Sequence, residues 1–279
     1  MVIDSGAEAL AAADGARAVV GVRHEASGGL ASDDWLPDER PLEIAVELTP
    51  LTVVLRTPGS AADDVALATG LLLAEGVIDG AEDLAGIARC DSPLAPPDGR
   101  VVARLAAGVP LPSAERLLVS ATGCGMCGKT LASQLARRVP VRTDAPQPPS
   151  PEEIRGLESR LRGSQQLFAR TGGVHGAALF KGGDLLDTTE DVGRHNAVDR
   201  LVGRRLLGAR TDLVGCWLWV SGRVSFELVQ KALRARAEAL VAVGAPTVLA
   251  VELARAHGLT LVGFARSGRF TVYAGAVGG

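Results

Sequence analysis

The sequence predicts an α/β protein whose N-terminal part has an α+β arrangement. After residue 150 the chain alternates strand-like apolar runs with amphipathic helical segments, which is typical of a sheet covered by helices. Four prolines between residues 145 and 152 mark a linker before this region. A chain of 279 residues, 47% of them hydrophobic, is long enough to bury more than one layer of core. We therefore expect a C-terminal mixed sheet with helices on both faces.

The chain divides into three parts by composition. Residues 1–40 are rich in alanine, glycine and aspartate without a sustained hydrophobic period, so we expect a flexible leader. Residues 41–145 should form an N-terminal α+β domain that ends in a cysteine loop and its helix. Residues 151–279 should form the C-terminal α/β domain.

The N-terminal domain begins with a predicted hairpin. Two β-rich runs, residues 42–48 and 51–57, lie on either side of Thr49 and Pro50. A helix follows, because Ser60 is an N-cap residue that precedes aspartates in the first turn, and Gly76 suits the helix end. Two short strands should follow, near Ile87 and over residues 100–108.

The C-terminal domain should alternate helices and strands. Helices are predicted over residues 152–169, 193–207, 225–237 and 246–257. Strands are predicted over residues 174–180, 185–189, 213–222, 239–243, 259–265 and 270–275. Because ligands of open α/β sheets bind beyond the carboxyl ends of the strands, the turns there should converge on one crevice.

A reactive sulfur site is predicted at the C-x-x-C formed by Cys124 and Cys127. The pair lies in a glycine-rich loop that opens a helix at Thr130, and Lys129 adds a cation. A helix N-terminus and a nearby cation both favour the thiolate. Three interpretations stay open from spacing alone: a structural zinc site, a thioredoxin-like dithiol, and a sulfur carrier that holds a persulfide.

Polar residues gather at the predicted strand ends. His175 lies at a strand start, while Arg194 and His195 lie at one strand-to-helix turn and Arg223 at the next. Both histidines are candidates for function, since each is flanked by glycine or by several polar groups.

Other polar residues near these turns have simpler interpretations. Asp191 and Ser225 are expected to be helix caps, and Glu190 and Asp191 to be solvated. Lys231 follows Glu227 by one helical turn and should pair with it.

Composition excludes several classes of function. The net charge is −3, so no global basic field favours nucleic acid or a membrane surface. Four cysteines in a chain of this length do not make a disulfide framework, and the N-terminus lacks a signal-peptide pattern. No apolar run reaches the length of a membrane span. We expect a cytoplasmic protein.

Five motifs in this order resemble the FdhD family, sulfurtransferase accessory proteins of formate dehydrogenase. The motifs are GCGMCGK, RTGGVHGAAL, EDVGRHNAVDR, SGRVSFELVQKA and TLVGFARSGRFTVY. The N-terminal segments LRTPG and GLLLAEGVI also resemble the family. The resemblance covers roughly residues 41–274.

The resemblance implies a sulfurtransferase that works as a persulfide carrier. Such proteins take sulfur from an IscS-type cysteine desulfurase on the C-x-x-C loop. They pass it to a molybdenum cofactor, bis(molybdopterin guanine dinucleotide), before the cofactor enters formate dehydrogenase. A cytidine deaminase-like C-terminal domain and a homodimer are also implied.

The resemblance also implies roles for individual residues. Cys124 would carry the persulfide, with Cys127 in the same motif. The cofactor-binding loop would comprise Phe264, Ala265, Arg266, Ser267, Gly268 and Arg269. The cofactor's phosphates match helix N-termini and arginines such as Arg194, Arg223, Arg266 and Arg269. We add His175 and His195 to this site, and expect no resident metal.

Two other functions are weighed against the sulfur carrier. A cofactor-holding chaperone would bind the cofactor without sulfur chemistry. A zinc-dependent hydrolase of the deaminase type would need H-x-E followed by P-C-x-x-C. Here Gly176 and Ala177 follow His175, and the C-x-x-C precedes the histidine.

Overall fold

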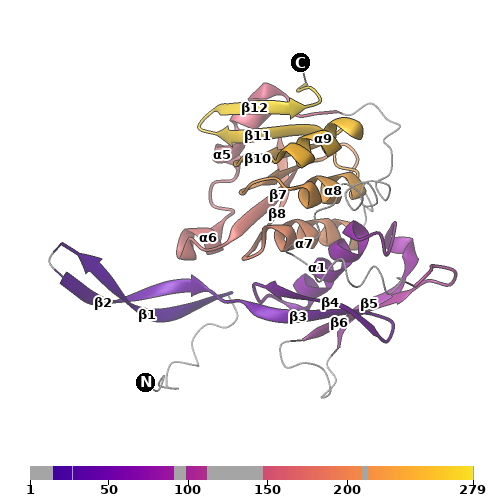
Figure 1. Ribbon diagram of the computed structural model, residues 1–279, viewed down its shortest axis with the longest axis horizontal. Coiled ribbons are helices and arrows are strands. Elements are labelled where there is room, and N and C mark those ends of the chain that lie inside the picture. Colours follow the sequence, from indigo (N-terminus) through magenta and orange to yellow (C-terminus); the bar gives the residue numbers. More distant parts are fainter. Residues whose placement is uncertain (1–14, 27, 91–98, 112–146, 209–212, 279) are drawn as a thin grey trace.

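The computed structural model describes residues 15–26, 28–90, 99–111, 147–208 and 213–278. Strands in these ranges form a two-stranded, a four-stranded and a six-stranded sheet. Figure 1 shows the six-stranded sheet above the four-stranded one, with α1 and α7 between them. The two-stranded sheet projects to one side.

The four-stranded sheet forms as the N-terminal pattern predicts. The predicted hairpin is β3 (Arg40–Val46) with β4 (Thr49–Arg56), and β6 (Arg100–Leu105) lies between β3 and β5 (Leu84–Cys90). A 3₁₀ turn, η2 (Ala81–Asp83), precedes β5. These strands match the predicted hairpin and the two short runs after it.

Helix α1 (Ala61–Ala74) begins and ends where its sequence signals place it. Ser60 accepts a hydrogen bond from the Asp63 backbone N–H, and the Asp63 carboxylate accepts one from the Ser60 N–H. This capping box satisfies two backbone donors at the helix start. Gly76, just beyond the end, has φ of +66°.

The six-stranded sheet has the order β12-β11-β10-β9-β7-β8. Three neighbouring strands are parallel, and the pairs at both sides are antiparallel. The strands are β7 (His175–Lys181), β8 (Asp184–Asp191), β9 (Trp217–Val220), β10 (Ala239–Ala242), β11 (Thr260–Arg266) and β12 (Arg269–Ala274). The predicted mixed sheet is confirmed.

Side chains alternate between two apolar layers, one on each face of this sheet. Leu179 and Leu218 face one layer with helices α7 (Arg194–Leu207), α8 (Phe226–Arg234) and α9 (Val248–Ala256). Phe180 and Trp217 stack with ring centroids 4.4 Å apart in the other layer. Short helices α4 (Pro151–Arg155) and α5 (Leu157–Arg160) cover that second layer. Helices therefore lie on both faces, as the alternating pattern predicts.

One apolar core continues from the first half of the chain into the second. Leu42 and Leu67 belong to the same buried cluster as Leu218. Helices α1 and α7 approach so closely that a Cβ added at Gly70 or Gly203 would overlap backbone of the opposite helix. Glycine is therefore required at both crossing points. The division into separate domains around residues 145–151 stays a prediction.

The expected flexible leader is wrong for most of its described part. Residues 16–37 form a regular hairpin, β1 (Ala16–Glu25) with β2 (Gly28–Pro37), in continuous antiparallel register. Backbone hydrogen bonds to a second strand order this stretch. The amino-acid composition of one strand does not show that a partner strand exists. Residues 1–14 lie outside the described residues.

The long helix expected over residues 152–169 is also wrong. The chain forms α4, α5 and α6 (Gln166–Thr171) instead. Gly156 ends α4, and Gly163 has φ of +83° between α5 and α6. Glycine lowers helix stability and takes left-handed conformations, so the helical pattern is interrupted twice.

Candidate functional site

The predicted turns converge at one edge of the six-stranded sheet. β7 is antiparallel to β8 and β9, so its first residue lies beside the ends of both strands, and His175 pairs with Asp191. The ends of β9, β10 and β11 follow at the same edge. Gly244 N–H donates to the Gly222 carbonyl at 3.1 Å, and Phe264 N–H donates to the Gly244 carbonyl at 3.2 Å. These bonds tie the three turns together.

A hollow of about 780 Å³ opens at this edge. Its apolar wall includes Trp219, Leu157 and Leu161, and its polar lining includes His175 and Arg266. A concave, mostly apolar surface with a few polar groups is the usual form of a small-molecule site.

A second hollow of about 620 Å³ shares Arg266 with the first. It is lined by Arg155, Phe264, Arg266, Gly268, Arg269, Phe270 and Thr271. Three of these residues are arginines, so the second hollow favours an anionic ligand.

The loop predicted to bind the cofactor comprises the end of β11, the two-residue turn after it and the first residue of β12. Phe264 and Ser267 have φ of +54° and +51°, and Gly268 has φ of +71°. The Ser267 N–H donates to Glu158 Oε1 at 2.6 Å, which fixes the loop against the first hollow. Arg266 and Arg269 are exposed, whereas Ala265 is buried in the second apolar layer. Two arginines of this loop are thus open to a ligand.

His175 and Arg194 lie together at the sheet edge. A Cβ at Gly222 would be 3.5 Å from His175 Nδ1 and 3.6 Å from Arg194 Cδ, so both side chains pass over this glycine. Burial lowers the pKa of His175, and the charges of Arg194 and His195 lower it further. Arg194 Nε is buried and has no hydrogen-bond partner among the described residues. The cationic guanidinium of Arg194, next to the neutral imidazole of His175, suits an anionic ligand.

His195 contacts the next turn. Its Nε2 atom lies 3.2 Å from Ser225 Oγ and 3.2 Å from Glu227 Oε2. The hydrogen bond with His195 lowers the pKa of Glu227. Ser225 is the N-cap residue of α8, but its side chain makes no capping hydrogen bond and turns to His195 instead. Arg223, two residues earlier, is exposed.

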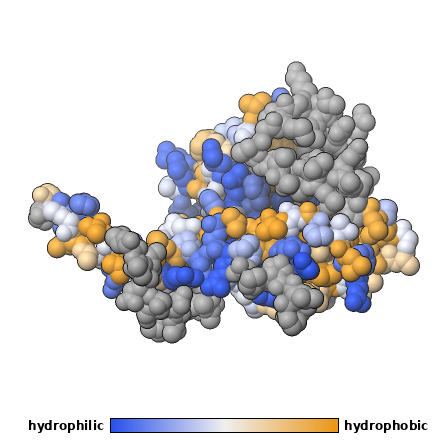
Figure 2. Space-filling model, turned by 60° about the horizontal axis from the view of Figure 1, so that its bottom comes forward, coloured by the Kyte–Doolittle hydropathy of each residue, from blue (hydrophilic) through white to orange (hydrophobic). Residues whose placement is uncertain are grey.

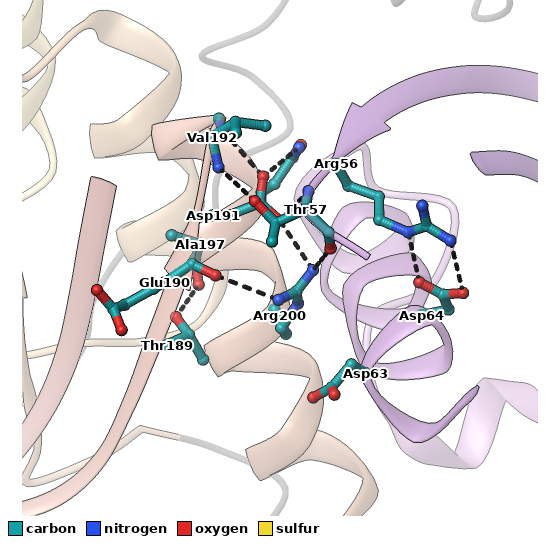
Figure 3. A network of polar contacts seen from close by, with 12 residues as sticks. Arg56, Thr57, Asp63, Asp64, Thr189, Glu190, Asp191, Val192, Ala197 and Arg200 are labelled. Carbon is teal, nitrogen blue, oxygen red and sulfur yellow. Dashed lines mark hydrogen bonds and ion pairs between the residues drawn. The ribbon is translucent and has the colours of Figure 1, made fainter. Parts of the chain in front are cut away.

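Four polar residues of EDVGRHNAVDR are buried, namely Asp191, Asn196, Asp199 and Arg200. Asp191 is fully buried and accepts hydrogen bonds from the N–H groups of Thr57 and Gly193 and from the side chains of Asn196 and Arg200. Figure 3 shows this network between α7 and the chain that follows β4. Burial raises the pKa of Asp191, and Arg200 opposes that rise. The expectation of a solvated Asp191 is wrong, because it joins the two halves of the core.

Two further expectations for polar residues are wrong. Glu190 is not simply solvated, since its carboxylate accepts from the Leu167 and Phe168 N–H groups at the start of α6. Lys231 does not pair with Glu227. Its Nζ lies 2.7 Å from both carboxylate oxygens of the buried Asp199, because α8 packs against α7 there.

The structure adds residues that the sequence analysis missed. Trp219 and Glu158 line the first hollow, with Gln165 and Phe168. Trp219 lies in an apolar run that resembles core. Strand alternation places it on the same face as Trp217, but only the tertiary structure shows that this face opens into a hollow.

The predicted sulfur-carrying residues, Cys124 and Cys127, lie outside the described residues. Among the residues that are described, no group of three or more His, Cys, Asp or Glu side chains is arranged to hold a metal ion. None of the described helices combines the length and the apolar composition needed to cross a membrane.

Comparison with known proteins identifies the family. The model of the FdhD/NarQ family matches residues 37–277. The chain belongs to the FdhD/NarQ family. Among curated relatives, a sulfur carrier protein FdhD from Streptomyces coelicolor is 47% identical, over 87% of this chain and 88% of its own. The FdhD of Mycobacterium tuberculosis is 41% identical, over 90% of this chain and 94% of its own.

A solved structure shows the same fold as this FdhD/NarQ chain. A crystal structure from Desulfotalea psychrophila, described as a formate dehydrogenase accessory protein, matches with a TM-score of 0.72. The match covers 93% of this chain and 96% of the other at 24% identity. The mixed α/β architecture is therefore confirmed, while the cytidine deaminase-like relationship stays a prediction.

Proposed function

We propose that this protein is a sulfur carrier that supplies sulfur to a molybdenum cofactor. Cys124 takes a persulfide sulfur from an IscS-type cysteine desulfurase. The sulfur is then passed to bis(molybdopterin guanine dinucleotide), which the protein holds as a bound substrate before insertion into formate dehydrogenase. Membership of the FdhD/NarQ family supports this proposal, as do the names of the curated relatives.

The observation that carries the proposal is the cationic sheet edge beside the two hollows. Arg194 presents a buried Nε that has no partner among the described residues, and Arg266 lies between the hollows. Guanine dinucleotides carry phosphates, which arginines bind through charge-assisted hydrogen bonds. The N-terminus of α7 lies at the same edge, and its N-cap residue, Gly193, has no side chain to occupy the helix N–H groups.

The sulfur chemistry requires a nucleophilic thiolate. The Cys124 thiolate attacks the outer sulfur of the donor's persulfide, so that the donor's S–S bond breaks and a new S–S bond forms on Cys124. The donor cysteine leaves as a thiolate, and no external oxidant is consumed. Cys127, three residues later, belongs to the same reactive motif.

The proposal includes a sulfurtransferase activity, a cytoplasmic location and association with formate dehydrogenase and with a second copy of the chain. The relative from Desulfotalea psychrophila is described as an accessory protein of formate dehydrogenase, which supports that partner. The motif required by a zinc deaminase is absent around His175, so that alternative has less support.

Intact-protein mass spectrometry tests the sulfur step. The protein is incubated with an active cysteine desulfurase and cysteine, and Cys124→Ala is the matched control. We expect a gain of one sulfur atom on the wild type that a reductant removes, with no gain on the variant. No gain on the wild type, with the desulfurase shown to be active, would instead favour a chaperone that only holds the cofactor.

A further inference from the structure

The hairpin of β1 and β2 is an arm that projects from the body of the protein (Figure 1). Along its outer part, Val20 is 73% exposed, Val22 64% and Leu30 63%. Figure 2 shows hydrophobic residues on the surface of the projecting arm. An isolated two-stranded hairpin is only marginally stable in water. Exposed apolar side chains along it therefore indicate a site of interaction with another protein chain.

The base of the arm is fixed to the body through β2. Arg170 of α6 lies over the ring of Trp35, with Cζ 3.6 Å from the ring centroid. A Cβ at Gly173 would contact Pro37 at 2.8 Å, so this end of β2 also packs closely against the segment after α6. β2 is thus the strand that faces α6, and the outer edge of β1 is left without a partner strand among the described residues.

The two edges of the arm differ in how they resist pairing with another strand. β2 has Asp33 and Asp34 in its middle and Pro37 at its base, and both acidic side chains and proline discourage strand addition. β1 has no proline, no lysine and no bulge in its ten residues. β1 does carry three charged side chains, Arg17, Arg23 and Glu25, but they are of both signs and can face opposite charges on a complementary strand. The edge of β1 is therefore the less protected of the two.

We propose that the β1 edge pairs with β1 of a second copy of this chain, antiparallel about a two-fold axis at Gly21. Two identical antiparallel strands related by a two-fold axis place one residue opposite its own copy. The two arms then form one four-stranded sheet in the order β2-β1-β1-β2. This pairing concerns only how two copies associate, and it does not rest on sulfur transfer.

The sequence of β1 selects Gly21 as the centre. With Gly21 opposite itself, Arg17 faces Glu25 of the other copy, and Val20 faces Val22, each contact occurring twice. Opposite charges and paired β-branched residues across strands are stabilising.

Neighbouring registers lose these contacts. A centre at Val20 places Arg17 opposite Arg23, and a centre at Val22 places Val19 opposite Glu25. Like charges directly opposite each other are destabilising, and a valine facing a carboxylate gains little. The Gly21 centre also places Val19 opposite Arg23, which gains little, but of these three centres it alone both joins opposite charges and pairs valine with valine.

Disulfide cross-linking tests the register of the two β1 strands directly. In Gly21→Cys the two substituted residues would lie about 4.5–5.5 Å apart by Cα, which is within the range of a disulfide. A Cβ at Gly21 meets only the Ser32 carbonyl, at 3.8 Å, so the variant fits the fold. Ser32 lies opposite Gly21 on β2, and the two Ser32 residues would be three strand spacings apart, roughly 14 Å. Ser32→Cys is therefore the matched control.

We expect oxidised glutathione to link two Gly21→Cys chains through a disulfide between the substituted positions. Peptide mass spectrometry would find this bond as a dimer of the β1 peptide. Ser32→Cys chains should stay unlinked at their substituted position. Failure of Gly21→Cys to link, or equal linking of Ser32→Cys, would overturn the proposed edge and register.

A charge exchange tests the same register without cysteine. Analytical ultracentrifugation should show a wild-type dimer that Arg17→Glu or Glu25→Arg each weakens by about tenfold, because like charges then face each other twice. The double variant should recover the wild-type dissociation constant. Arg17 also lies 3.3 Å from Asp38, but Glu25→Arg cannot repair that contact. Recovery of the dissociation constant would therefore show that residues 17 and 25 face each other across the two copies. A double variant that dimerises as weakly as Arg17→Glu, or a wild type that is monomeric, would refute the pairing.

Discussion

Arg200 and Asp191 form a buried ion pair, with Nη2 2.8 Å from Oδ2, and both side chains bind Thr57 of the first half of the chain. The same guanidinium donates to the Thr57 carbonyl at 3.0 Å, and the same carboxylate accepts from the Thr57 N–H at 3.2 Å. Thr57 follows β4, whereas Arg200 lies in α7. The pair therefore holds the start of α7, with Arg194 and His195, in a fixed position relative to the N-terminal sheet.

Replacement of Asp191 by Asn should destabilise the protein strongly. The amide keeps the shape but presents an N–H₂ group to donors that need an acceptor, and it leaves Arg200 buried without its counter-charge. Breaking one partner of a buried pair costs about 3–5 kcal/mol in the free energy of unfolding. Urea denaturation measures this loss. Glu252→Gln, an exposed carboxylate on α9, is the control and should change stability little. Equal stability of the two variants would contradict the structural role of Asp191.

Gly203→Ala should lower stability through the contact of α1 with α7. The added Cβ would overlap the Ala66 carbonyl of α1, which cannot move without separating the helices. Overpacking of this kind costs about 1–3 kcal/mol or more. Gly86→Ala is the matched control, since a Cβ there meets nothing within 4 Å. Thermal unfolding should show a clear loss for the first variant and little for the second.

His175 should titrate below its ordinary pKa of 6.5. Because the unfolded chain binds a proton more readily, the free energy of unfolding should fall as pH drops from about 6.5 through the lower folded pKa. His175→Gln should lack that part of the acid destabilisation. Arg194→Gln should move the His175 titration, followed by NMR, toward higher pH, because one of the charges that opposes protonation is removed. An unchanged titration in that variant would argue against the His175–Arg194 cluster.

Local signals in the sequence predict much of the fold. Ser60 caps α1 as expected, and Ser150 caps α4 in the same way, each in a capping box with the residue three positions later. The convergence of the turns also follows from sequence, because parallel strands end at the same edge of a sheet. These inferences need only neighbouring residues or a general rule of topology.

What the sequence does not reveal depends on partners distant in the chain. Lys231 lies one helical turn after Glu227, yet it forms its ion pair with Asp199 of another helix. That pair is buried, where the attraction between opposite charges is stronger. Within one short motif, Asp191 turns inward while Arg194 turns to the edge of the six-stranded sheet, beside His175. The direction of each side chain depends on where α1 and β4 lie in the fold. The spacing of residues within the motif does not predict it.

We propose that the cationic edge of the six-stranded sheet holds a guanine nucleotide cofactor. Isothermal titration calorimetry with GDP tests it on the full chain. The wild type should bind, and Arg194→Gln should weaken binding by about ten- to a hundredfold through the loss of a charge-assisted hydrogen bond. Arg104→Gln, on the exposed surface of the four-stranded sheet, should bind like the wild type. Equal affinity of the wild type and Arg194→Gln, or no binding by the wild type, would contradict the assignment of the site.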